Sequence, residues 1–314
     1  MSDSTTPQPG KAFVPGGPPS ESSEAEGLEL AVRSQWSYAR SRFFHHRLAL
    51  LGLATLIFIF GAGFLANWVA PYPYRGFEPL TVLQHPSWAH PFGTDENGLD
   101  LLSRVIYGIR TSAQIGLVVA ILSTLLGIVI GAFAGYYGGW IDNLLMRTTD
   151  LFLTLPFLAI LLTAAKLLQT VEAWQITFLL AAFFWTGIAR IVRGVFLSLR
   201  EKEYVEAAKA SGASDRRIMF RNILPNTLGP IVVNGTLAVG TAILTEAALS
   251  FLGFGIQPPT PSLGELIFAA QDYTYYWWLQ IFPGILIVII VLSVNLVGDG
   301  LRDALDPTQR RMRA

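Results

Sequence analysis

Residues 204–226 read YVEAAKASGASDRRIMFRNILPN and form a polar, charged island between two long apolar runs. The preceding turn and the first half of this stretch are rich in good helix formers, and Gly212 stands where a helix C-cap residue would. Ser214 and Asp215 are favoured N-cap residues, so a second short helix can begin there and run until Pro225 stops it. The stretch therefore predicts a helix, a tight turn and a second helix.

One face of this predicted hairpin suits contact with another surface. The small side chains of Ala207 and Ala208 let a second helix come close. The apolar Ile218, Met219 and Phe220 would be costly to leave in water, so they need a partner. The alternative is a connecting hairpin that packs on its own protein.

The motif Glu206-Ala207-Ala208, followed by Gly212 and by Leu224-Pro225, resembles the EAA loop of permease subunits of ATP-binding-cassette (ABC) importers. In that family the loop docks into a cleft on the cytosolic ATPase subunit. The resemblance implies a coupling loop over residues 200–226, with Asn222 where the family pattern has an apolar residue. Its implied coupling residues are Glu206, Ala207, Ala208, Gly212, Ser214, Asp215, Ile218, Phe220, Leu224 and Pro225.

Composition places the chain among membrane proteins. It is 52% hydrophobic and 14% charged, with a mean hydropathy of +0.47. Six apolar runs approach the roughly 20 residues that a helix needs to cross a bilayer. They cover about residues 48–70, 112–135, 144–168, 173–193, 227–250 and 279–298. The sequence predicts an all-α integral membrane protein with six transmembrane helices.

The positive charges predict the orientation of these helices. With the N-terminus in the cytoplasm, 18 of the 22 Lys and Arg residues fall on the inner side. The other four, Arg75, Arg104, Arg110 and Lys166, fall outside. Because inner loops are enriched in Lys and Arg, both termini and the coupling loop are predicted to be cytoplasmic.

The predicted organisation has three parts. Residues 1–27, rich in Ser, Pro, Gly and Glu, are expected to be a disordered cytoplasmic N-terminus. Residues 28–84 are expected to hold an amphipathic helix on the cytoplasmic membrane face over 28–47, the first span and the start of an external loop. The resemblance implies that residues 85–314 form the ABC permease transmembrane domain.

Residues 90–112, HPFGTDENGLDLLSRVIYGIRTS, form a second motif. They resemble a series in the second, C-type permease subunit of dipeptide and oligopeptide ABC importers, with Leu99 in place of the usual Arg. The resemblance runs from about residue 34 to the C-terminal end. A plain structural turn, with Asp residues capping the following helix, is the alternative for this motif.

The predicted spans contain a few notable residues. Arg147 and Asp150 lie three apart and are expected to pair, while Pro156 should kink the third span. Asn234, Glu246 and Asn295 are polar residues in apolar helices and are candidates for the translocation path. Because an ionised carboxylate in lipid is costly, Glu246 is expected to face a cavity or an inward polar partner.

The chain lacks a phosphate-binding loop, cysteines and His residues spaced for zinc, so it is not expected to be an enzyme. The resemblance implies that ATP and Mg²⁺ are bound by two ABC ATPase subunits, with no cofactor in this chain. It also implies a homologous permease partner, an extracytoplasmic binding protein, a bacterial cell membrane around the chain and no nucleic acid. The implied cargo is a peptide. Nickel import by the same family and, in another class, a secondary carrier are the alternatives.

Overall fold

A computed structural model of the chain describes residues 35–78, 81–167 and 172–305. The long apolar helices all lie in one compact unit, Ala39–Ala314. Helix α2 (Gln35–His45) accounts for part of the predicted amphipathic helix. That helix ends at His45, before the predicted end at residue 47, because His46 caps the next helix. Residues 28–34 of the predicted helix, the predicted disorder of residues 1–27 and the C-terminal tail from residue 306 lie outside the described residues.

The described residues contain five helices long and apolar enough to cross a membrane, and a sixth span if one bent pair is counted. The five are α3 (Arg47–Phe64), α5 (Leu101–Tyr137), α8 (Ala173–Leu199), α11 (Leu224–Phe251) and α13 (Trp278–Leu305). The pair is α6 (Gly139–Thr154) and α7 (Phe157–Leu167), bent by 78°. Pro156 lies at the bend, as predicted, because proline cannot continue the helical hydrogen bonding.

Helix α5 begins well before the predicted span at residue 112. Its start is fixed by Asp100, whose carboxylate accepts the backbone N–H of Ser103 at 2.8 Å. An N-cap of this kind satisfies a backbone donor that the helix leaves free. The helix therefore continues from the external motif into the membrane, and the capping role proposed for this Asp is confirmed.

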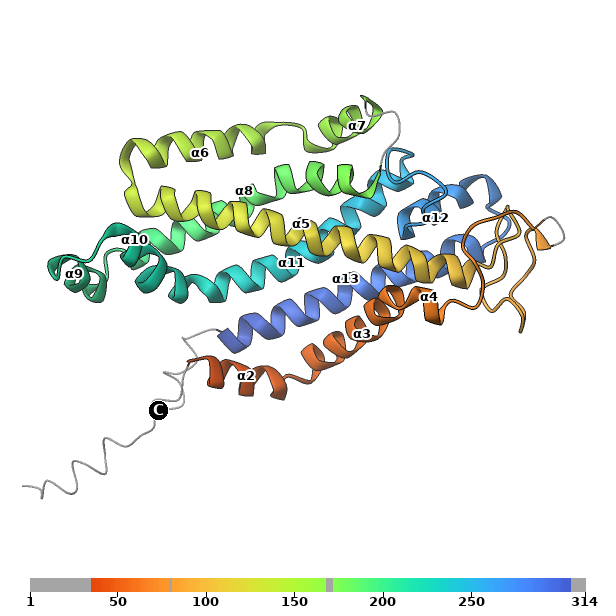
Figure 1. Cartoon of the computed structure of the whole chain (residues 1–314), viewed down its shortest axis with the longest axis horizontal. Coiled ribbons are helices and arrows are strands. Elements are labelled where there is room, and N and C mark those ends of the chain that lie inside the picture. The colour runs from red at the N-terminus through yellow and green to blue at the C-terminus, as the bar shows by residue number, and fades with distance from the viewer. Residues whose placement is uncertain (1–34, 79–80, 168–171, 306–314) are drawn as a thin grey trace, which may run out of the picture. The chain divides into compact units, whose positions relative to one another are not determined.

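Among the described helices, α5 and α8 share the most extensive contact, and they run side by side in Figure 1. Gly127, Gly131 and Gly135 recur every fourth residue on the contact face of α5. A Cβ atom at any of the three would collide with atoms of residues 188–196 in α8. Small residues at this spacing let two membrane helices approach closely and gain van der Waals contact.

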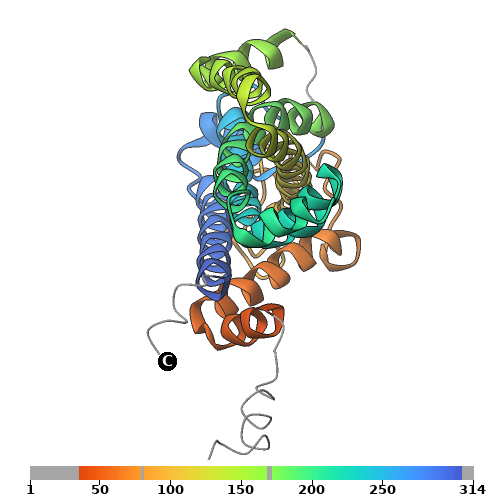
Figure 2. The same cartoon turned by 90° about the vertical axis from the view of Figure 1, so that its left-hand side faces the viewer.

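Helix α11 lies between α5 and α13, and α3 packs on α13 and α5 (Figures 1 and 2). The short helix α4 (Ala66–Val69) follows α3. At the end of the bundle that is predicted to be external, α12 (Leu263–Ala269) and the 3₁₀ turn η3 (Ala270–Tyr273) connect α11 to α13. Helix α12 contacts α5, α11 and α13, so it is inserted among the spans.

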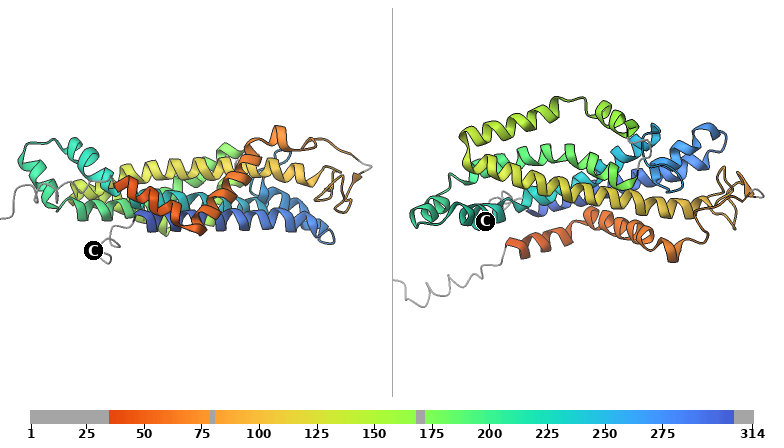
Figure 3. Two further views of the ribbon diagram at one scale, coloured as in Figure 1. Left: turned by 90° about the horizontal axis from the view of Figure 1, so that it is seen from below. Right: turned by 45° about the horizontal axis from the view of Figure 1, so that its top comes forward.

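Helices α6 and α7 form an outer layer beside α5 and α8 (Figure 3). Arg193 donates two hydrogen bonds of 2.6 Å to Asp142, and Arg190 donates one of 2.5 Å to Asp150. The predicted pairing of Asp150 with Arg147 is therefore wrong. The carboxylate bonds instead to an arginine on the neighbouring helix, and the two ion pairs connect α6 to α8.

Candidate functional site: the coupling loop and the buried polar clusters

The first half of the coupling loop (residues 200–226) is helix α9 (Glu203–Ala210) and the turn that ends it. Ala213 donates its N–H to the carbonyl of Ala208 at 3.1 Å, and Gly212 donates to Lys209 at 2.9 Å. This is the Schellman pattern of helix ends. Gly212 has φ +77°, a left-handed conformation that side chains with a Cβ adopt only at a cost. Gly212 therefore makes the sharp reversal predicted for it.

The second half differs from the prediction. After Ser214 the chain forms α10 (Asp215–Arg217), a π-helical turn η2 (Ile218–Ile223) and then α11. Pro225 does not end this helix: it lies in the first turn of α11, directly after the π-helical turn, and the helical backbone continues through it. The loop and the span after it form a continuous helical segment.

One face of the loop is buried in its own protein. Val205, Ile218, Met219 and Ile223 have almost no exposed surface and pack in one cluster with side chains of α5 and α8. The expectation that Ile218 and Met219 need an outside partner is therefore wrong. The bundle covers them, and this burial fixes the loop at the ends of the spans.

Polar contacts hold the same face. The hydroxyl of Tyr136, at the end of α5, donates to Asp215 at 2.7 Å. The ammonium of Lys209 lies 5.9 Å from the centre of the Tyr136 ring. The guanidinium of Arg200 donates to the carbonyl oxygens of Gly135 and Tyr136 at 3.4 and 3.3 Å. Asp215 is thus bonded within the chain, although its carboxylate stays at the surface.

The opposite face of the loop is exposed. It carries Glu206, Ala207, Ser214 and Pro225, whereas the half-buried Ala208 and Leu224 pack against the buried cluster. Phe220 is a large apolar side chain on this face, with 51% of its surface exposed. The side chain of Glu206 makes no hydrogen bond or ion pair within the described part of the chain. This face offers small, apolar and unpaired charged groups to a partner.

Glu246 in α11 is fully buried and accepts three hydroxyl hydrogen bonds. The donors are Ser112 of α5 at 3.0 Å, Ser250 of α11 at 2.8 Å and Ser262 at 2.8 Å. Ser262 also accepts the N–H of Glu265 and so caps α12. The inward polar partner predicted for Glu246 is confirmed. Its place on the translocation path stays a prediction, because the carboxylate is fully buried and meets these three hydroxyl groups within the described residues.

The two asparagines differ from each other. Asn234 is partly buried, and its amide donates to the carbonyl of Pro230 in its own helix at 2.8 Å. Asn295 is exposed on α13, and its side chain makes no hydrogen bond among the described residues. Asn234 therefore satisfies its helix locally, whereas Asn295 remains a candidate for the path or for the partner contact.

A second buried polar cluster surrounds Arg104 at the external start of α5. Its guanidinium donates to Asp95 in the external segment (residues 71–100) and to both carboxylate oxygens of Glu265 at 3.2 Å. A carboxylate oxygen of Glu96 lies 3.9 Å from a terminal guanidinium nitrogen of Arg104. Burial raises the pKa of Glu265 to about 7 although Arg104 opposes the shift, and burial also raises the pKa of Glu96.

This cluster was not predicted as a site. Asp95 and Arg104 belong to the external motif, but the side chain that completes the cluster, Glu265, lies 161 residues beyond Arg104. The signal in the sequence was an acidic residue, Glu265, in a stretch without Lys or Arg. A lone acid of this kind needs a positive partner when it is buried.

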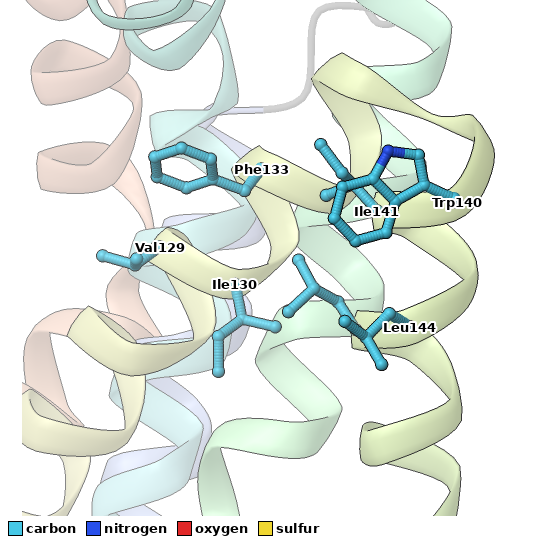
Figure 4. A pocket seen from close by; sticks show the side chains of 7 residues that line it. Val129, Ile130, Phe133, Trp140, Ile141 and Leu144 are labelled. Atoms are coloured by element: carbon cyan, nitrogen blue, oxygen red, sulfur yellow. The ribbon is translucent and has the colours of Figure 1, made fainter.

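An apolar pocket of about 300 Å³ lies between α5 and α6. Figure 4 shows that its lining side chains, such as Phe133, Trp140 and Leu144, come from both helices. None of the lining residues carries a charge or a hydroxyl group. The pocket can therefore contact apolar groups such as lipid chains, but its lining has no catalytic or ion-binding group.

Two family models match the chain. The family described as binding-protein-dependent transport system inner membrane component matches residues 127–311. The N-terminal TM domain of oligopeptide transport permease C matches residues 34–86. The first match contains the coupling loop and the second contains the first span. Together they cover most of the described residues.

Several curated proteins are similar over nearly their whole length. The oligopeptide transport system permease protein OppC of Mycobacterium tuberculosis (strain H37Rv) is 40% identical over 87% of this chain and 94% of that protein. The dipeptide transport system permease protein DppC of Alkalihalophilus pseudofirmus is 38% identical over 94% of this chain and 95% of that protein. The OppC protein of Bacillus subtilis is 38% identical, covering 92% and 94%.

A solved structure shares the fold. It is a chain of the inward-facing MetNI methionine ABC transporter, with a TM-score of 0.54 and 20% identity over 66% of this chain and 98% of that chain. The helical order, the coupling loop and these similarities agree. The chain belongs to the binding-protein-dependent transport system inner membrane component family, and it is a multi-pass, non-catalytic permease subunit of an ABC importer.

Proposed function

We propose that this permease carries peptides, either oligopeptides or dipeptides, across the membrane. The relatives reported above are named for these two substrates, which favours a peptide over nickel. The family gives the chain a binding protein and ATPases as partners. The binding protein is proposed to deliver the peptide from outside the membrane, and a homologous second permease is proposed to complete the translocation path.

The coupling loop is proposed to be the contact with the ATPase. The observation that supports this is the division of the loop into two faces, one buried against α5 and α8 and the other exposed. A loop with one face fixed in the bundle can transmit a displacement to the spans as a rigid body. The exposed Ala207, Ser214 and Phe220 are then available to the partner.

ATP and Mg²⁺ are proposed to bind between the two ATPase subunits, and closure of those subunits would move the coupling loop. A ligand shifts an equilibrium only by its different affinity for the two states. In this scheme ATP favours the closed ATPase pair and, through the loop, the outward-facing permease. Hydrolysis then restores the inward-facing state.

The cargo can be tested by reconstituting the permease pair, the ATPases and the binding protein in lipid vesicles. Labelled dipeptides, longer peptides and Ni²⁺ are offered at equal concentration, and ATP-dependent uptake is measured. We expect uptake of at least one class of peptide. Uptake of Ni²⁺ alone would contradict the proposal.

The docking can be tested with Ala207→Arg and Gly212→Val. A long charged side chain at position 207 would prevent close approach, and Val at position 212 is strained by the left-handed backbone, although its Cβ has open space. We expect both variants to insert in the membrane but to lose the ATPase on co-purification. Gly139→Val is the matched control. Gly139 also has a left-handed backbone, with φ +54°, and a Cβ atom there would contact nothing, but the residue lies outside the coupling loop.

A further inference from the structure

A polar recess of about 540 Å³ lies in the coupling loop, where α9 turns back into α10. One wall is the Schellman turn, from Ala208 to Ala213. The other wall is formed by Arg217, Arg221 and Asn222. Both walls belong to segments fixed by the buried cluster of the loop, because Ile218 and Met219 lie between the two arginines. The recess is therefore formed before any partner binds.

The charge in the recess is not balanced by the described residues. Arg217 and Arg221 are four residues apart, on one side of the helical segment, where two like charges disfavour each other. Neither guanidinium makes a hydrogen bond or an ion pair within the described part of the chain. Asp215, an acid close in sequence, instead accepts the hydroxyl of Tyr136. The recess carries two unpaired positive charges.

The other polar groups of the recess are largely occupied. Two N–H groups of the turn donate to carbonyls of α9, and the hydroxyl of Ser211 donates to the carbonyl of Ala207 at 2.8 Å. The free donors are mainly the two guanidinium groups. A guanidinium fork matches the two oxygens of a carboxylate better than any neutral acceptor. The recess thus has the shape and the charge for an acidic side chain.

We propose that this recess receives a carboxylate side chain of the cytosolic ATPase, held by Arg217 and Arg221. The inference rests on the proposed docking of the coupling loop and specifies its chemistry. Phe220, exposed next to Arg221, would supply the apolar contact beside the ion pair. A lipid phosphate is the other anion to consider. The loop projects beyond the ends of α5 and α6 in Figure 1, which favours the ATPase.

Charge reversal tests the recess directly. Arg217→Glu and Arg221→Glu should each reduce recovery of the ATPase with the permease pair roughly tenfold or more, since each places like charges together. Arg216→Glu is the matched control. Arg216 is exposed on the same short helix but does not line the recess, so we expect a change of less than about twofold. Equal losses in all three variants would overturn the proposal.

A chemical cross-link tests the contact without depending on affinity. A carbodiimide joins an amine to a carboxylate that touches it, so Arg217→Lys should form a new covalent bond to an acidic residue of the ATPase. Arg216→Lys should not. Peptide mapping by mass spectrometry separates the new cross-link from any at the native Lys202 and Lys209. Absence of a cross-link from both Arg217→Lys and Arg221→Lys, in a complex that still forms, would contradict the proposal.

Two further comparisons separate the possible failures. If Ala207→Arg removes the ATPase while Arg217→Glu and Arg221→Glu do not, the recess inference is wrong and the docking stands. If none of the three has an effect, the docking itself is wrong. The measurements are repeated in vesicles with and without anionic phospholipid. An effect of Arg217→Glu that needs the anionic lipid would assign the recess to a lipid phosphate instead.

Discussion

Glu246 joins three elements through one carboxylate. Its hydrogen bonds reach α5, α11 and the cap of α12. Each buried hydroxyl left without its acceptor costs about 1–3 kcal/mol. We therefore expect Glu246→Leu to lower the melting temperature of the detergent-solubilised chain by several degrees.

Glu246→Gln keeps one acceptor oxygen and should fall between the wild type and the Leu variant in the same thermal assay. Thr245→Leu is the control, because Thr245 is only partly buried and its hydroxyl donates to the carbonyl of Thr241 in its own helix. A Leu variant at position 246 that melts like the wild type would show that the serine contacts do not stabilise the chain.

Glu265 should make the stability of the external end depend on pH. Its pKa is about 7 in the folded chain, raised by burial from 4.5, so the folded state holds the proton more tightly than the unfolded state. The stability is then fully present below pH 4.5 and is lost as the pH rises to 7. The loss is roughly 3 kcal/mol at most.

The charged groups that face Glu265 are Arg104, Asp95 and Glu96. Thermal melts of the wild type and of Glu265→Gln between pH 4.5 and 8 test the dependence. The wild type should become less stable across this range, and the Gln variant should show a smaller slope. Glu206→Gln, at an exposed position, should leave the slope unchanged.

At the level of single residues, the sequence predicted that a polar side chain is buried in the bundle. It did not predict which residues form hydrogen bonds with that side chain. Glu246 was expected to turn inward because a charge in lipid is costly. Its partner Ser112 lies 134 residues away in the chain, and no local pattern connects the two. The arginine cluster at Glu265 escaped prediction for the same reason. The burial of a charged residue can be predicted from the apolar sequence around it. Its hydrogen-bond partner on another helix depends on how the helices pack.

At the level of elements, α6 is held to α8 by two ion pairs of unequal exposure. Asp142 and Arg193 are 15% and 35% exposed and bond in a bidentate manner, whereas Asp150 and Arg190 are about half exposed with one bond. Exposed pairs contribute about 0–1 kcal/mol, and partly buried bidentate pairs contribute more. We expect Asp142→Asn to destabilise the chain more than Asp150→Asn.

A double-mutant cycle with Arg193→Gln and Arg190→Gln measures the two coupling energies. The coupling of the Asp142 pair should be about 1 kcal/mol or more, and that of the Asp150 pair should be smaller. Equal coupling energies would show that burial does not distinguish the two contacts.

The helices were easier to predict than their ends and the contacts between them. The bend at Pro156 was predicted because the cause lies in one residue. The pairing of Arg147 with Asp150 was wrong because the spacing rule considers one helix, and Arg190 competes from the next. Pro225 was misplaced because a proline that ends one helix can equally begin another.

At the level of the whole molecule, the apolar runs predicted the helical membrane architecture because lipid requires every span to be helical. The described residues contain five such helices, or six spans if the bent pair is one of them. The buried face of the coupling loop could not be predicted in this way. An apolar residue such as Ile218 covers its own bundle or a partner, and the sequence pattern is the same in both cases. Only the tertiary contacts distinguish a packed face from a docking face.

The predicted orientation places the coupling loop in the cytoplasm and the external segment on the other side of the membrane. It rests on the 18 of 22 positive residues assigned to the inner side. The chain has no native Cys, so single Cys variants report unambiguously. Ser214→Cys lies on the exposed face of the loop, and Trp88→Cys lies in the external segment at a fully exposed position.

A membrane-impermeant maleimide is added to right-side-out and inside-out vesicles. We expect Trp88→Cys to be labelled in the first and Ser214→Cys in the second. Ala242→Cys is the control, because Ala242 is fully buried in the bundle and should stay unlabelled in both. An odd number of spans between positions 88 and 214 is what places them on opposite sides. Labelling of both exposed positions in one kind of vesicle would therefore contradict the six-span arrangement, including the interpretation of α6 and α7 as one bent span.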